Sequence, residues 1–380
     1  MRRLFNSMPL TLPRNAQYVA TLSSLVFRGS GDESTSSAPD LTRVYPDVAY
    51  VSALGEAELK EFLRLADAHH VTVRALQTLD QAAATLRGRD QLRSWCQRAL
   101  ANERDRIINA VEHLTQVCQA LEAAGAPVAV IKSLDHWPDL GSDLDLYTSG
   151  DEQTLLYVMT EQFKARLEPR SWGDRLANKW NFKLPGLPEL VEVHVRYLGQ
   201  TGEQKALAHR VIERSVTRTV ADRTFRVPAP EERVIISTLQ RMYRHLYFRL
   251  CDMADFAKLI GDGAIDFREL QKAAELGGIW PGVATFLLLI SKYVNASGGP
   301  VVELPPAVLA AVPTPDVRVR LGGQFLRVPK RPAAALYGSQ LLSAGRHADL
   351  RAICRLPLLP PLAISALLAY RLTGNDKGVW

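Results

Sequence analysis

Residues 130–147 read VIKSLDHWPDLGSDLDLY, and this stretch decides the fold. It begins inside the β-branched run PVAVIK (residues 127–132), which predicts a short buried strand. After a connection of about ten residues, Asp143 and Asp145 alternate with leucines in a second predicted strand. Side chains at positions i and i+2 leave an extended strand on the same face, so the two carboxylates can share a divalent cation.

A hairpin further along the chain offers a third carboxylate. Residues 180–184 and 190–197 alternate between apolar and polar, and the turn sequence PGLP joins them. Three valines occupy one face of the second strand, while Glu192 and His194 occupy the other. Glu192 is therefore predicted to complete an acidic site with Asp143 and Asp145. Three oxygen ligands of this kind favour Mg²⁺, with Mn²⁺ as the alternative ion.

Helical patterns surround these strands. Apolar residues three and four apart predict helices over residues 55–124 and a further helix over 152–167. A helical region is predicted to open at residues 228–232 and to continue to residue 294. A smaller hairpin is predicted around Ala221 and Asp222. Arg249, Asp252 and Asp255 stand three apart. We interpret them as an ion-pair array on one helix that joins the helical region to the sheet, or as residues that close over a substrate.

These patterns predict an α+β fold with a small mixed or antiparallel sheet between two helical regions. The expected divisions are a leader with a flexible Ser/Gly-rich loop (residues 1–45, the loop being 28–40), an N-terminal helical region (46–124), the sheet domain (125–227), a helical domain (228–298) and a basic, Pro-punctuated helical region (299–380).

Composition excludes several classes of protein. The 380 residues are 47% hydrophobic and hold four widely spaced cysteines, which excludes a disulfide scaffold and a mainly disordered chain. Those cysteines are expected to be reduced thiols in a cytoplasmic protein. The net charge is +6, but residues 316–380 alone carry +7, so a nucleic-acid partner would be sought in that region.

An apolar stretch lies near the C-terminus. Residues 356–370 are shorter than the roughly 20 residues that a membrane-spanning helix needs. We expect a terminal helix that packs on the protein. The alternative is a helix on a membrane surface, flanked by Arg351, Arg355 and Arg371.

Four segments, in this order, resemble a known family. They are AGAPVAVIKS (124–133), SDLDLY (142–147), VEVHVRY (191–197) and RLCDMADFAKLIGDGAIDFREL (249–270). The chain is similar to an uncharacterised bacterial nucleotidyltransferase family of the DNA polymerase beta-like superfamily. The resemblance covers residues 114–274 and implies a nucleotidyltransferase palm at residues 125–227.

The resemblance also implies roles for individual residues. Asp143, Asp145 and Glu192 correspond to the catalytic, metal-binding carboxylates, and His194 to the histidine that follows the third acid. Lys132 corresponds to a lysine that reaches nucleotide phosphates. Ser133 stands where the family usually has glycine, and its hydroxyl is expected to donate to a phosphate.

The expected function is Mg²⁺-dependent transfer of a nucleoside monophosphate from an NTP such as ATP to an acceptor hydroxyl on a small molecule or a protein. Two alternatives stay open. One is a toxin that modifies RNA, which the basic C-terminal region favours because lysine and arginine bind phosphates. The other is a degenerate module that binds nucleotide or a partner without catalysis, which Ser133 favours.

Overall fold

The computed structural model describes residues 14–28 and 41–373, and within them the chain mixes many helices with three small sheets. The largest sheet has five strands in the order β1-β2-β5-β4-β3. Its strands are β1 (Val128–Val130), β2 (Asp143–Thr148), β3 (Arg166–Leu167), β4 (Lys179–Lys183) and β5 (Leu190–Val195). Strands β2 and β5 are parallel, and the other pairs are antiparallel, so the sheet is mixed.

The two faces of this sheet differ in chemistry. On β4, Phe182 points to the buried face together with Val191 and Val193 of β5, and all three are fully buried. The opposite face carries Lys179 and Asn181 in register with the polar residues of β5. The strict alternation in both strands produces this division, and it confirms the antiparallel hairpin predicted from the sequence.

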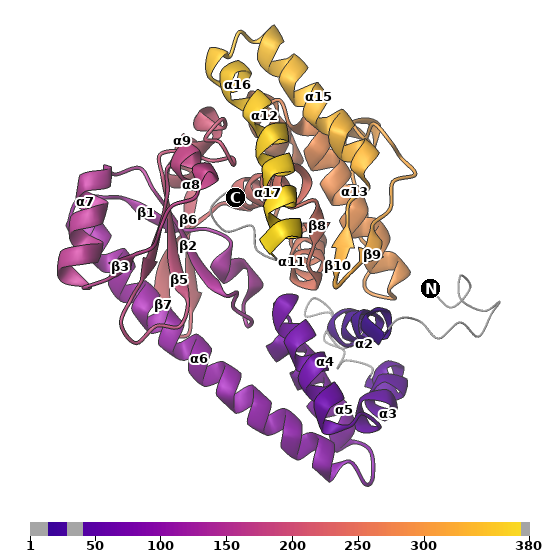
Figure 1. The fold of residues 1–380 in the computed structure, drawn as a ribbon. Helices are drawn as coiled ribbons and strands as arrows, with labels where there is room; N and C mark the ends of the chain where they lie inside the picture. Colours follow the sequence, from indigo (N-terminus) through magenta and orange to yellow (C-terminus); the bar gives the residue numbers. More distant parts are fainter. Residues whose placement is uncertain (1–13, 29–40, 374–380) are drawn as a thin grey trace.

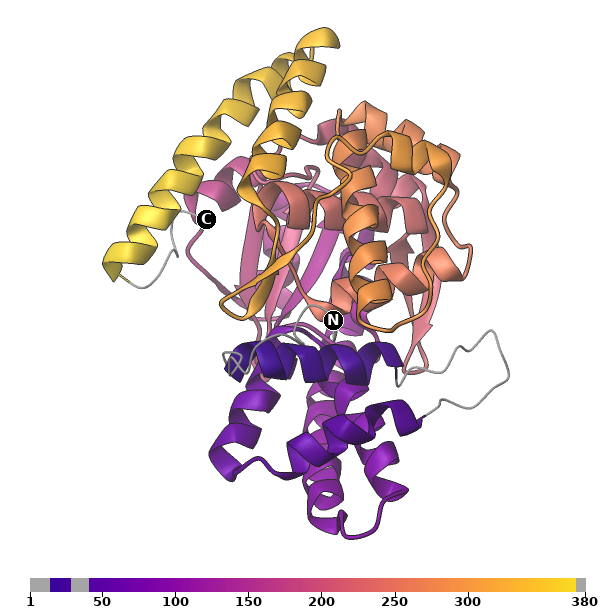
Figure 2. The ribbon, with the colours of Figure 1, turned by 90° about the vertical axis from the view of Figure 1, so that its right-hand side faces the viewer.

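The helices that precede the sheet in the sequence form a separate layer, drawn in indigo and purple in Figures 1 and 2. They are α2 (Arg14–Arg28), η1 (Leu41–Val44), α3 (Tyr45–Ser52), α4 (Glu56–Ala68), α5 (Thr72–Ala84) and α6 (Asp90–Ala123). The 34-residue helix α6 runs from this layer to the sheet (Figure 1).

Helix α2 was not predicted, yet it belongs to the core, because its Tyr18, Leu22 and Leu25 are almost completely buried. It packs against α5 and against α11 (Leu250–Gly261). Residues 29–40, which make up most of the predicted flexible loop, lie outside the described residues.

The segment predicted as a helix over 152–167 is shorter than expected. Helix α7 (Glu152–Tyr157) continues as a wider turn, η3 (Val158–Gln162), and the chain then reverses at Lys164, whose φ is +51°. Residues 166–167 join the edge of the sheet as β3 instead. Two residues of backbone pairing with β4 therefore replace the last helical turn.

The remaining elements before the helical region are α8 (Trp172–Ala177), α9 (Lys205–Glu213), β6 (Ser215–Val220) and β7 (Arg223–Pro228). Strands β6 and β7 form the small hairpin predicted around Ala221 and Asp222. Both turn residues have positive φ angles, 47° and 60°, as a two-residue type I′ connection requires.

The helical region and the C-terminal region are joined by a second sheet, in the order β8-β10-β9. The helical region holds α10 (Pro230–Thr238), η4 (Leu239–Arg244), β8 (Tyr247–Phe248), α11, α12 (Phe267–Leu276) and α13 (Trp280–Ala296). The C-terminal region holds α14 (Pro306–Ala310), β9 (Arg320–Gly322), β10 (Phe325–Arg327), α15 (Lys330–Arg346), α16 (Leu350–Arg355), η5 (Leu356–Leu358) and α17 (Leu359–Thr373).

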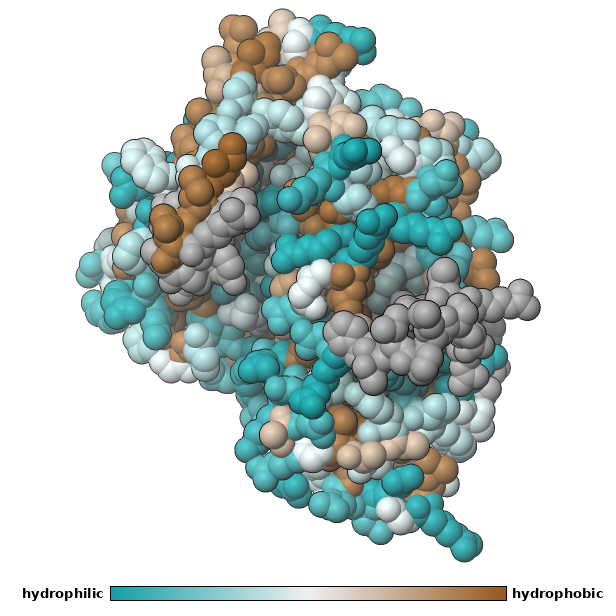
Figure 3. Space-filling model, turned by 45° about the vertical axis from the view of Figure 1, so that its right-hand side comes forward, coloured by the Kyte–Doolittle hydropathy of each residue, from teal (hydrophilic) through white to brown (hydrophobic). Residues whose placement is uncertain are grey.

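The apolar C-terminal helix packs less than predicted. Leu356 and Leu359 are buried with Ala344 and Ala352, which anchors the start of α17. Further along the helix, Ile364 is 59% exposed and Leu372 is 84% exposed. Figure 2 shows α17 projecting along the side of the molecule, and a ridge of hydrophobic side chains stands at the corresponding place at the upper left of Figure 3. Among the described residues, none of the helices has the length and apolar character needed to cross a membrane.

Basic side chains of the C-terminal region also serve packing. Arg355 donates to the backbone carbonyls of Leu176 and Thr201, and Arg351 donates to that of Gly202. Both guanidinium groups lie over the ring of Tyr197, Arg351 at 4.0 Å from its centroid. These two arginines therefore hold the C-terminal helices against the sheet domain.

Candidate active site

Three predicted site residues meet on the polar face of the large sheet. The parallel pairing of β2 with β5 sets Asp145 directly opposite Glu192. His194 follows two residues later on the same face, and Asp145, Glu192 and His194 each place one ligand atom within 4.8 Å of the others. Asp143 shares this face at the start of β2 and is more exposed, and its Oδ2 accepts a hydrogen bond from Ser142 at 3.3 Å.

Crowding of acids on this face changes how they ionise. Burial, together with the nearby carboxylates of Glu192 and Asp145, raises the pKa of Asp143 to about 6. Burial also raises the pKa of Asp145, although Lys132 opposes this shift. Burial acts in the same direction on Glu192, but the ammonium groups of Lys179 and Lys132 outweigh it, so the pKa of Glu192 is lowered.

Two lysines balance the negative charge. Lys132 Nζ contacts Asp145 Oδ1, and Lys179 Nζ lies 3.1 Å from Glu192 Oε2 and 3.0 Å from Asp174 Oδ1. Lys132 has a φ of +61°, so the backbone turns sharply between β1 and the connection and leads its side chain back toward β2. The two cations therefore contact the acids that the sequence pattern singled out.

Lys179 was missed by the sequence reasoning, although a signal for it existed. The predicted strand began at residue 180, one residue too late, and the alternation of KWNFK (179–183) places Lys179 opposite His194. Arg244, at the end of η4, was missed as well. Its charge contributes to lowering the pKa values of Glu192 and His194, so it lies near the acidic face. No local sequence pattern identifies Arg244 as a site residue, because it belongs to the helical region and not to the strands that carry the acids.

The imidazole of His194 is buried and has no hydrogen-bond partner among the described residues. Neither ring nitrogen makes a hydrogen bond to any described residue, and Nε2 lies 3.9 Å from Asp145 Oδ1. Burial and the charges of Lys132 and Lys179 lower the pKa of His194 well below its usual value, so the ring is neutral. A neutral, unpaired imidazole can accept a hydrogen bond or bind a metal ion.

Ser133 uses its hydroxyl inside the protein. Its Oγ donates to the backbone carbonyl of Asp143 at 3.1 Å and accepts from the backbone N–H of Asp145 at 2.7 Å. The backbone N–H of Ile131 already bonds to the carbonyl of Asp145, so the serine side chain extends the ladder between β1 and β2. Its one hydroxyl proton therefore points at β2, where it holds the two acids in position.

The side chains of Arg249, Asp252 and Asp255 pair with other segments rather than with one another, so the predicted array on one helix is wrong. The predicted link from this helix to the sheet domain is present, because Asp255 contacts His136. Arg249 precedes α11 and contacts His70, whereas Asp252 pairs with Arg241 at 2.8 Å. Asp255 accepts hydrogen bonds from His136 and from Arg74 of α5. These residues connect α11 to neighbouring segments, because helix packing brings charged partners closer than their own helix does.

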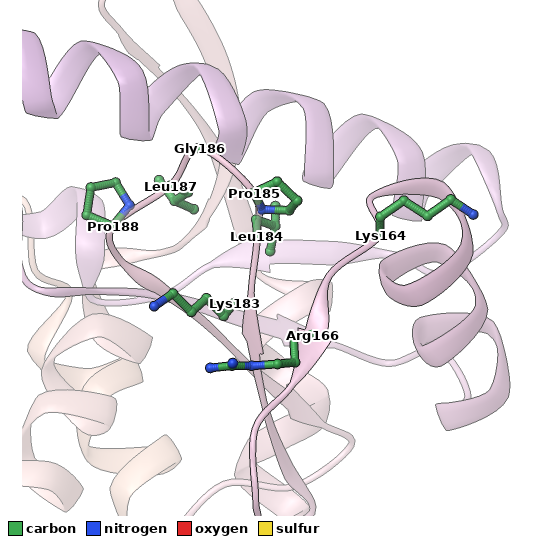
Figure 4. A pocket seen from close by; sticks show the side chains of 8 residues that line it. All are labelled: Lys164, Arg166, Lys183, Leu184, Pro185, Gly186, Leu187 and Pro188. Atoms are coloured by element: carbon green, nitrogen blue, oxygen red, sulfur yellow. The ribbon is translucent and has the colours of Figure 1, made fainter.

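An open groove of about 460 Å³ lies at the sheet edge, away from the acids (Figure 4). It is lined by Lys164, Arg166, Lys183 and the turn 184–188. The strand register places Arg166 and Lys183 in one row with Leu190 and Asp143, so both cations belong to the sheet face that carries the acids. In Figure 4 their side chains extend in the same direction.

The donor set of the acidic face fits a divalent cation. Asp145 and Glu192 supply carboxylate oxygens, which are the ligands that Mg²⁺ prefers, and His194 adds an unpaired nitrogen. Asp143 lies on the same face but outside this close group. Lys132 and Lys179 now neutralise these carboxylates. A bound cation would take over that charge balance and release the two ammonium groups.

Comparison with known proteins gives a match to one protein family. A search of curated proteins found no match to the chain. The profile of a family described as "Uncharacterised nucleotidyltransferase" matches residues 55–295. The matched region runs from α4 to α13 and includes every residue of the acidic face. Because it spans more than half of the 380 residues, the chain belongs to this uncharacterised nucleotidyltransferase family.

Proposed function

We propose that this protein is a Mg²⁺-dependent nucleotidyltransferase that moves a nucleoside monophosphate from an NTP to the hydroxyl of a small molecule or a protein. The observation that carries the proposal is the register of β2 with β5, which sets Asp145 against Glu192 and adds Asp143 and His194 on the same face. Family membership supports the same reaction class.

The three carboxylates would hold the ion. When bound, Mg²⁺ stabilises the negative charge of the triphosphate and of the oxygens that enter and leave phosphorus. In the reaction, a bond forms between the acceptor oxygen and the α-phosphorus, the bond from that phosphorus to pyrophosphate breaks, and the hydroxyl proton passes to solvent.

The protein's own cations prepare the binding of the nucleotide. Lys132 is only 11% exposed and touches Asp145, so a short side-chain movement would exchange that carboxylate for a phosphate oxygen. Arg244 of the helical region adds a guanidinium whose charge acts on Glu192 and His194. A triphosphate on the acidic face would therefore meet the positive charge of Lys132 and of Arg244.

The test is transfer of radiolabel from each α-labelled NTP by purified protein, with Asp145→Asn and Asp143→Asn compared with the wild type. Each substitution removes an anionic ligand but keeps the size of the side chain, so we expect the rate to fall by about 10²-fold or more. Asp105→Asn, an exposed position on α6, is the matched control and should transfer at the wild-type rate.

Two results would contradict the proposal. Wild-type activity in both acidic-face variants would exclude Asp143 and Asp145 from the reaction. Calorimetry that detects NTP binding by a wild type that forms no labelled product with any NTP would instead support a module that binds nucleotide without catalysis.

A further inference from the structure

A second cluster of metal-ligand side chains lies apart from the acidic face. His70, His136 and Cys251 are all buried, and each places one ligand atom within 4.8 Å of the other two. The three residues come from the junction of α4 and α5, from the connection between β1 and β2, and from the first turn of α11. The members are 66 to 181 positions apart in the chain, so no spacing pattern in the sequence identifies the cluster.

His136 has the orientation that a metal-bound histidine needs. Its Nδ1 lies 2.5 Å from Asp255 Oδ2, and Arg74 fixes the other oxygen of that carboxylate at 2.6 Å. The opposite ring nitrogen, Nε2, then faces Cys251 Sγ at 3.8 Å. A carboxylate that holds one nitrogen while the other faces a ligand site is the usual support of histidines bound to zinc.

The other two ligands are also held in place. Cys251 lies in the first turn of the 12-residue helix α11, and its buried Sγ faces His136. The His70 ring packs against Gly141, where a Cβ atom would come within 2.8 Å of it. The His70 ring is therefore confined by backbone, and the Cys251 thiol is placed by its position at the start of α11.

One group competes with a metal ion for His70. Arg249 Nη1 lies 2.7 Å from Nε2 and 3.2 Å from Nδ1 of that ring. A bound cation would have to displace this guanidinium, whose Nε makes no hydrogen bond to any described residue. Arg249 thus opposes metal binding at this site without contributing a ligand to it.

We propose that His70, His136 and Cys251 bind one Zn²⁺ ion, which ties the N-terminal helices and the connection before β2 to α11. One thiolate and two imidazoles form a ligand set typical of zinc, whereas the acidic face offers the oxygen ligands that Mg²⁺ prefers. A water molecule would take the fourth position of the tetrahedron that zinc prefers. Because the site is buried, its role is to hold three segments together. The proposal does not depend on nucleotidyl transfer.

The experiment loads the full-length protein with Zn²⁺ or with Co²⁺. Bound metal per chain is measured by mass spectrometry, and the thiolate-to-cobalt charge-transfer band is measured by absorption. We expect one tightly bound ion in the wild type and loss of the band in Cys251→Ser. Cys96→Ser, which removes another fully buried thiol, and Asp145→Asn, which alters the acidic face, should both keep the band.

Arg249→Gln provides a second test of metal binding, in which no metal ligand is removed. It should keep the band and bind Zn²⁺ about tenfold more tightly, because a competing cation is gone. A folded wild type that takes up no stoichiometric Zn²⁺ and shows no cobalt band overturns the proposal, even if Cys251→Ser fails to fold. Retention of the band in a folded Cys251→Ser variant overturns it as well.

Discussion

Replacing Ser133 with alanine tests how the acid pair is positioned. The substitution removes both hydrogen bonds of the hydroxyl and changes little else, because Ser133 is only 3% exposed and alanine fits the same space. The backbone N–H of Asp145 is buried and would lose its partner, which costs about 1–3 kcal/mol of unfolding free energy. The carbonyl of Asp143 is only partly buried, so water can replace that bond at little cost.

The effect on catalysis follows from the same geometry. The hydroxyl donates its proton to β2, so it has none to offer a phosphate, and we expect the KM for NTP to change little in Ser133→Ala. The kcat should fall by about tenfold, because Asp143 and Asp145 lose the side chain that fixes their strand.

Urea unfolding and the radiolabel assay together check this reasoning. Ser52→Ala is the control, because its hydroxyl bonds only to the carbonyl of Val48 within one helix, and we expect an effect below about 0.5 kcal/mol. An unchanged unfolding free energy in Ser133→Ala, with a KM for NTP that rises while kcat is kept, would refute the argument and assign the hydroxyl to phosphate binding.

Two further predictions concern buried groups. Arg241→Met leaves the buried carboxylate of Asp252 without its guanidinium partner, so the free energy of unfolding measured in urea should fall by about 3–5 kcal/mol. The exposed pair of Lys60 and Glu56 is the control, and Lys60→Met should lower the free energy of unfolding by less than about 1 kcal/mol. An equal loss in both would contradict the role of burial. Burial raises the pKa of Cys96 and Cys118 to about 12, so at about pH 8 alkylation should modify the exposed Cys354 first, and Cys354→Ser should abolish that fast phase. Rapid alkylation of Cys96 in the folded protein would contradict the packing around it.

Strands and turns with a strong local pattern were predictable. The alternation in residues 180–197 and the turn PGLP predicted the hairpin of β4 and β5, because burial of one face selects a period of two. The weakest predictions concerned segments whose structure depends on neighbours. Residues 166–167 pair with β4 although the local pattern predicted a helix, and α2 owes its buried face to packing against α5 and α11.

By itself, the sequence determined which residues could carry chemistry and which strand face they occupy. Asp143, Asp145, Glu192 and His194 follow from alternation within single strands, since the geometry of an extended chain is local. Only the tertiary structure decided what these residues meet. The parallel pairing of β2 with β5 set Asp145 against Glu192, and separate segments supplied Lys179 and Arg244. Charges and ligands combine through space at distances of a few ångströms, and no spacing along the chain records that proximity.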